Sequence, residues 1–156
     1  MGKKFGKADF GQLKDLYKKF DRLDEKQIAD FYEAAAKELA ARLLGLVIPR
    51  TPVGDYTSSS GKTGGTLRRG WTNESDMDFS SYAQSLSVEH KGTLYIIEII
   101  NPVDYASYVE LGHRTKNHKG WVAGQFMLTI SEEELQAATP QILEKKIVDM
   151  FKDVFK

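Results

Sequence analysis

The sequence predicts an α+β fold in which a small antiparallel sheet packs against a long N-terminal helix and a C-terminal helix. Two segments of helical periodicity, residues 24–48 and 140–155, lie toward the two ends of the chain. Between them the pattern around residues 91–93 indicates a pair of strands. The 156 residues contain no internal repeat and no second boundary, so we interpret residues 1–156 as one domain.

A short amphipathic helix is expected over residues 9–20, and a longer helix follows it. Asp24 is placed as the N-cap of the longer helix, and Gln27 stands three residues on, as in a capping box. Apolar residues then recur at helical spacing for several turns. Pro49 is expected to end this helix near Ile48, because proline cannot donate a backbone hydrogen bond.

Residues 51–65 consist largely of glycine, serine and threonine, and we predict a flexible loop there. The loop is long for a compact domain, and loops of that length are usually functional or disordered. Within it, Gly61-Lys62-Thr63 is similar to the end of a phosphate-binding loop. The first glycine of that motif is missing, so no nucleotide site is expected.

The centre of the chain predicts antiparallel strands. Residues 66–71 read as a short strand or a turn of helix, and residues 82–90 alternate as a half-buried strand does. Residues 91–93 make a hairpin connection. Residues 94–100 are apolar at almost every position, which is typical of a central strand covered on both faces.

After the turn at Asn101-Pro102, Asp104 is placed as the N-cap of a short helix that Gly112 ends. Residues 112–124 are basic, aromatic and bounded by glycine, and we expect an exposed flexible loop. Residues 124–134 are ambiguous. They predict either a helix or a strand followed by a helix with Ser131 at its N-cap.

Composition excludes several classes of protein. The chain has no cysteine, which excludes disulfides and thiolate metal sites. Its formal net charge is zero, whereas a dedicated nucleic-acid binder usually shows a basic excess. No apolar run approaches the ~20 residues that span a bilayer. The basic N-terminus has no apolar segment after it, so no secretory signal is expected.

No set of residues predicts catalysis, a metal site or a cofactor site. His113 and His118 flank basic residues, and their spacing matches no zinc signature. Arg68 and Arg69 beside Trp71 are more typical of an interface than of a phosphate site. The alternative from a different class is a small nucleic-acid-processing or toxin-like enzyme that uses His113 and His118.

The order of the short motifs carries more information than any one of them. In sequence they are Thr51-Pro52-Val53, Gly64 or Gly65, Leu67-Arg68-Arg69, Trp71, Asn101, Tyr105-Ala106, Tyr108-Val109-Glu110, Gly112, Arg114 and Met127. Together they resemble the HK97-type head–tail joining family of tailed bacteriophages and prophages, variously described as neck, tail-completion or minor tail proteins. Residues 54–63 depart from the family pattern, which often continues without a break from the Thr-Pro-Val motif to the glycine.

The resemblance implies a structural virion protein at the head–tail junction, made and assembled in the bacterial host cytoplasm, and not an enzyme. The expected partners are other copies of the chain in a ring, with six as the expected number, and portal-side connector and tail tube or terminator proteins. No membrane partner is expected. The candidate interface residues are Arg68, Arg69, Trp71, Tyr105, Tyr108, Glu110, Gly112, Arg114 and Trp121.

We expect the charged members of this set to make contacts within or between subunits, with the aromatic members packed beneath them. One alternative is that the basic loop faces DNA in a central channel through Lys116 and Lys119. Another is a monomeric adaptor that leaves before the tail is complete.

Overall fold

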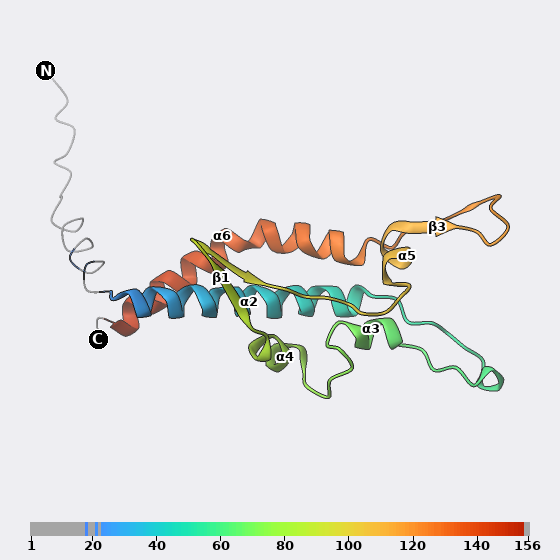
Figure 1. Ribbon diagram of the computed structural model, residues 1–156, viewed down its shortest axis with the longest axis horizontal. Coiled ribbons are helices and arrows are strands. Elements are labelled where there is room, and N and C mark those ends of the chain that lie inside the picture. Colours follow the sequence, from blue (N-terminus) through green and yellow to red (C-terminus); the bar gives the residue numbers. More distant parts are fainter. Residues whose placement is uncertain (1–17, 19–20, 22, 155–156) are drawn as a thin grey trace, which may run out of the picture.

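The computed structural model describes residues 18, 21 and 23–154. Two long helices run antiparallel along its length, α2 (Glu25–Arg50) and α6 (Met127–Val154), and every other element lies against or beyond them (Figure 1). The predicted α+β class is confirmed. The helix expected over residues 9–20 lies almost wholly outside the described residues.

Helix α2 begins as the sequence predicts and ends later. The Asp24 carboxylate accepts the Gln27 N–H at 2.7 Å, and the Gln27 side chain accepts the Asp24 N–H at 3.1 Å. The expected end near Ile48 is wrong by two residues, because Pro49 lies inside the last turn. The Thr51 N–H donates to the carbonyls of Val47 and Ile48, which holds that turn together.

Helix α6 is one continuous element, so residues 124–134 take the helical alternative from Met127 on, and the separate final segment expected from Pro140 is wrong. Ser131 is buried inside the helix and donates its hydroxyl to the Met127 carbonyl at 2.6 Å, so it is not an N-cap. Pro140 also lies inside the helix, where we expected a new segment to start. The start of α6 depends on a residue from another element, Glu110, which local sequence does not indicate.

Two short α-helices precede the first pair of strands. Residues 66–71 take the helical alternative, as α3 (Thr66–Gly70). Helix α4 (Phe79–Ser85) replaces the first half of the strand expected over residues 82–90 and packs against α2. The Asp78 carboxylate caps α4 by accepting the N–H groups of Ser80 and Ser81, and this local cap outweighs the alternating pattern.

The predicted hairpin is present. Strand β1 (Val88–Lys91) pairs antiparallel with β2 (Leu94–Ile97), with Lys91 opposite Leu94. Gly92 adopts φ 60° in the two-residue turn, a conformation that glycine reaches without steric cost.

Strand β2 is covered on one face only, so the prediction that residues 94–100 form a central strand covered on both faces is wrong. Ile97 and Ile99 pack against the core. Leu94, Ile96 and Ile100 point the other way and are 61%, 38% and 58% exposed. The reason is that the sheet has two strands and that only α2 and its neighbours cover it.

Helix α5 and the residues between it and α6 form the end of the molecule away from the last residues of α6 (Figure 1). Helix α5 (Ala106–Leu111) has Tyr105 at its N-cap position and no side-chain cap, so the assignment of Asp104 as N-cap is wrong. Gly112 ends the helix as predicted. Residues 112–124 are exposed for the most part, but they are not an irregular loop.

Those residues form a hairpin, with β3 (Gly112–Arg114) paired to β4 (Trp121–Ala123). We call residues 112–124 the arm. Residues 51–65, with the short 3-10 helix η1 (Ser58–Ser60), extend beyond the same end of α2 (Figure 1).

The core lies where α2, α3, α4 and the first turn of α6 meet. Its buried apolar residues are Ala40, Leu44, Val47, Leu67, Trp71, Ala83 and Met127. The polar residues Thr51 and Ser131 are fully buried beside it, and both donate their hydroxyls to carbonyls one turn earlier. This packing fixes the end of α2 from which the 51–65 loop leaves, and the arm lies beyond the same end (Figure 1).

Candidate functional site

Thr51 is the centre of a buried joint between α2 and α3. Its hydroxyl donates to the Val47 carbonyl and accepts the indole N–H of Trp71, each at 2.7 Å. Its carbonyl accepts the Arg68 guanidinium, from Nε at 3.1 Å and from Nη2 at 2.7 Å. Two residues predicted at an interface, Arg68 and Trp71, therefore contact the interior of their own chain.

The two adjacent arginines have different surroundings. Arg68 also donates to the Pro49 carbonyl at 3.2 Å, so its charge lies at the C-terminal end of α2, where the helix dipole favours a cation. Arg69 is exposed and donates to the Gly64 carbonyl at 3.1 Å, which fastens the end of the 51–65 loop to α3.

Asn101 ties the chain after β2 to α3. Its side-chain amide donates to the Leu67 carbonyl at 2.8 Å, and its side-chain oxygen accepts the Val103 N–H at 3.2 Å. Gly70 lies directly against Asn101, and a Cβ at position 70 would collide with that side chain. The Asn101-Pro102 turn is thus held by its own asparagine.

Glu110 caps the N-terminus of α6 from a neighbouring element. Its carboxylate accepts the N–H groups of Leu128 and Thr129, each at 2.9 Å, and the Thr129 hydroxyl at 2.7 Å. Partial burial acts to raise the pKa of Glu110, but these hydrogen bonds outweigh it, and the pKa lies below the usual glutamate range. We predicted that the Glu110 carboxylate pairs with a cation at an interface, but in the structure it caps the N-terminus of α6.

Arg50 is a structural residue that sequence reasoning missed. In the last turn of α2 it donates to the Ser131 hydroxyl at 2.9 Å and forms an ion pair with Glu134 at 2.8 Å. The only local signal is a cation at a helix C-terminus, which the dipole favours whether or not a partner is present.

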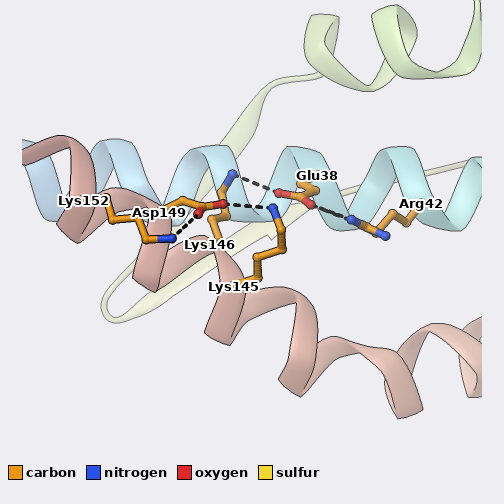
Figure 2. A network of polar contacts seen from close by, with 6 residues as sticks. All are labelled: Glu38, Arg42, Lys145, Lys146, Asp149 and Lys152. Atoms are coloured by element: carbon orange, nitrogen blue, oxygen red, sulfur yellow. Dashed lines mark hydrogen bonds and ion pairs between the residues drawn. The ribbon is translucent and has the colours of Figure 1, made fainter.

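A second connection joins the two long helices at the middle of α2 and in the C-terminal half of α6 (Figure 2). Glu38 on α2 pairs with Lys146 on α6 at 3.0 Å and with Arg42 one turn along at 2.9 Å. Asp149 pairs within α6 with Lys145 at 3.0 Å. The helices thus form a frame fastened at two places.

The arm and its base expose apolar residues beside cations. Trp121 is 62% exposed, and Tyr108 and Leu111 on α5 are exposed to a similar degree. Trp121 lies opposite Arg114 in the hairpin, so both side chains belong to the same face of the arm. Residues 112–124 include Arg114, Lys116 and Lys119 and no acidic residue.

The two histidines of the arm do not form a recognisable active site. The Nδ1 atom of His113 is buried without a hydrogen-bond partner, and its ring lies 5.8 Å from that of Tyr108. His118 is exposed in the turn with φ 57°. Among the described residues, no group of three or more His, Cys, Asp or Glu side chains is arranged to hold a metal ion.

A comparison with protein-family models found one that matches residues 14–112, which is more than half of the chain. Its description is "Bacteriophage HK97-gp10, putative tail-component". The chain belongs to this HK97-gp10-like family. The comparisons with curated proteins and with solved structures found no match. The predicted resemblance to a phage family is thus confirmed at the level of a tail component, and the expectation of a non-enzyme agrees with that description.

The family match divides the molecule into two parts. The joint around Thr51, the turn at Asn101 and helix α5 lie within the matched residues of the HK97-gp10-like family, whereas the arm beyond Gly112 and α6 follow them. No helix in the described ranges is both long and apolar enough to traverse a bilayer.

The predicted interface residues fall into two groups by their surroundings. Arg68, Trp71 and Glu110 are held by contacts within the chain, Gly112 is buried, and exposed Arg69 fastens the 51–65 loop. The exposed members without an internal ion pair in the described structure are Tyr105, Tyr108, Arg114 and Trp121.

Proposed function

We propose that this HK97-gp10-like chain is a structural protein of the head–tail junction of a tailed bacteriophage or prophage, a neck or tail-completion component of the virion. Its family of tail components supports the proposal. The partners we propose are other copies of the chain in a ring of six, portal-side connector proteins, and tail tube or terminator proteins.

The observation that carries the proposal is the exposed aromatic surface at the arm end. Tyr108, Leu111 and Trp121 lie close in sequence to cations and present large apolar side chains to solvent. Exposed apolar patches of this kind usually mark protein–protein contacts, and Trp, Tyr and Arg are enriched at the residues that contribute most to binding. Helix α5 and the arm, which carry these residues, lie at one end of a frame of two long helices (Figure 1).

Charge on the arm supports a further partner within the same role. Arg114, Lys116 and Lys119 lie within one hairpin that has no acidic residue. If the arm lines the channel of a ring, these cations face DNA phosphates without reading sequence. DNA binding that weakens with salt and is lost in the Lys116→Ala/Lys119→Ala variant would support this contact.

The experiment is complementation of a phage from which the gene has been deleted. We expect the deletion to leave heads and tails unjoined, the intact chain to restore infectious particles, and mass spectrometry to find the chain in them. The His113→Ala/His118→Ala variant should complement like the wild type, because the role is not catalytic.

The Arg114→Glu/Trp121→Ala variant should fold and fail to complement. The histidine variant is its matched control, because all four substitutions lie in the arm. Mature particles without the chain would contradict the proposal, and so would loss of complementation in a folded histidine variant.

A further inference from the structure

The outer face of β1–β2 is an apolar sheet face that nothing in the described chain covers. Leu94, Ile96 and Ile100 project from it, whereas the alternate residues pack inward on the core. A run that is apolar at both parities is typical of a strand buried on both faces. The amino-acid pattern of β2 is therefore that of a strand covered on both faces, whereas the described chain covers only its inner face.

Charge on the same face is uneven. Glu89 and Lys91 lie opposite Ile96 and Leu94 and pair with each other at 3.0 Å, so their charges offset. Glu98 follows the parity of Ile96 and Ile100 and is exposed. In the described part of the chain the Glu98 carboxylate has no ion pair and no hydrogen-bond donor, which leaves the face with a net negative charge.

The arm has the complementary composition. Arg114 and Trp121 occupy one face of its hairpin, and Arg114 has no ion-pair partner among the described residues. A planar guanidinium pairs well with a carboxylate, and an indole covers aliphatic side chains with a large apolar area. The arm therefore carries a cation that could pair with Glu98. It also carries an apolar surface that could cover Leu94, Ile96 and Ile100.

The two surfaces do not contact each other within the described chain. The turn of the β1–β2 hairpin lies in the half of the molecule that contains the C-terminal end of α6, and the arm projects beyond the opposite end (Figure 1). A contact between them must therefore join two copies. When each arm packs on a different copy from the one whose arm its own sheet receives, the contact is head-to-tail, the kind that closes into a ring when its rotation divides the circle.

We propose that the arm of one copy packs on the outer face of β1–β2 of the next copy. Trp121 covers Leu94, Ile96 and Ile100, and Arg114 pairs with Glu98. The inference rests on the proposed function for its partner, a second copy of this chain. It adds which two surfaces meet and predicts that each subunit uses both.

A charge exchange tests the contact in the full-length chain. Association is measured by sedimentation velocity and native mass spectrometry. We expect Arg114→Glu and Glu98→Arg each to weaken association by at least about tenfold, because like charges then oppose each other, and the double variant to recover to within about threefold. Lys26→Glu and Glu144→Arg are matched controls at exposed positions elsewhere, and each should associate like the wild type.

Disulfide trapping supplies a second readout, because the chain has no cysteine of its own. The Glu98→Cys/Arg114→Cys variant should form a ladder of linked oligomers under mild oxidation. The Glu144→Cys/Arg114→Cys control should not. If the wild type stays monomeric in solution, the same two variants are compared in assembled tails, where the ladder is again expected.

The outcomes separate this contact from the proposed function. Particles that contain the chain but show no Glu98–Arg114 cross-link overturn the contact and leave the function standing. A ladder from a chain that is absent from particles supports the contact and contradicts the function. If Arg114→Glu weakens DNA binding while neither single charge reversal changes association, the arm is a nucleic-acid surface and the contact is wrong.

Discussion

Trp71 donates its indole N–H to the hydroxyl of Thr51 at 2.7 Å, and both residues are buried where α2 ends and α3 turns back on it. The same threonine receives Arg68 on its carbonyl. Residues 51, 68 and 71 belong to the motifs that resemble the phage family, and their contacts show that these motifs build an internal joint. The joint fixes the direction in which the 51–65 loop leaves α2.

Removing the hydrogen bond at this joint should destabilise the chain. Trp71→Phe loses the bond to Thr51 and part of the indole volume in the core. We expect the free energy of unfolding to fall by about 1–3 kcal/mol. Trp121→Phe is the matched control, since Trp121 is exposed, and should change it by less than about 0.5 kcal/mol. Urea denaturation of both variants measures the difference. Equal effects would mean that the joint is not where the structure places it.

Glu110 should make stability depend on pH. Its pKa is lowered in the folded chain, since hydrogen bonds from Leu128 and Thr129 outweigh its burial. The carboxylate therefore stabilises the fold above the ordinary glutamate pKa of about 4.3, and this contribution is lost as the pH falls through the folded-state value.

We expect Glu110→Gln to cost about 1 kcal/mol at pH 7, which is typical of a lost helix cap. The difference from the wild type should shrink below about pH 4. Denaturation at a series of pH values checks this, and a difference that stays constant down to pH 3 would exclude the cap as its source.

Gly112 should be required for the arm. It adopts φ 86° and ψ 171°, a region that is essentially restricted to glycine. A Cβ there would lie 2.5 Å from the Val122 carbonyl oxygen and 2.8 Å from the Gly124 nitrogen. Gly112→Ala should cost about 1–3 kcal/mol and open the β3–β4 pairing.

Hydrogen exchange of the arm amides is the measurement for this variant. Faster exchange at residues 112–124 is expected for Gly112→Ala. Gly120→Ala is the control, because a Cβ at Gly120 would meet only the Thr115 side chain at 3.3 Å. Unchanged protection of the arm in Gly112→Ala would show that the glycine is not needed there.

The ion pair between Glu38 and Lys146 should contribute little and depend on salt. Burial acts to raise the pKa of Glu38, but hydrogen bonds and charges from Lys146 and Arg42 outweigh it and lower the pKa. Both side chains are partly exposed, so we expect a coupling energy of about 0.5 kcal/mol in a double-mutant cycle of Glu38→Gln and Lys146→Met.

That coupling should fall toward zero near 1 M salt. A coupling above about 2 kcal/mol, or one that salt does not change, would mean that the pair is buried more deeply than the structure shows.

Features with a local cause could be predicted from the sequence. The capping box at Asp24 and Gln27, the hairpin turn at Gly92 and the helix end at Gly112 each depend on residues only a few positions apart. The fold class followed from periodicity alone, because two helical patterns flanked a pair of strands.

The remainder depends on contacts between distant residues. Helix α6 begins at Met127 because Glu110 caps it, and Ser131 is buried because Arg50 and the core surround it. The sequence around residues 127–131 does not reveal that Glu110 and Arg50 are the partners of this turn. For the same reason, the sequence could not predict which interface candidates are held inside the chain and which are free to contact a partner. Arg68 and Arg69, for example, are adjacent in sequence but donate hydrogen bonds to different parts of the chain.

The most direct test of the account compares the two tryptophans by hydroxyl-radical footprinting of the free chain and of assembled tails. Trp71 is 4% exposed and Trp121 is 62% exposed in the chain described above. We predict that assembly protects Trp121 strongly and leaves the low reactivity of Trp71 unchanged, because the arm meets a neighbour while the joint stays inside its own subunit. Equal modification of Trp121 in the free chain and in assembled tails would contradict the account.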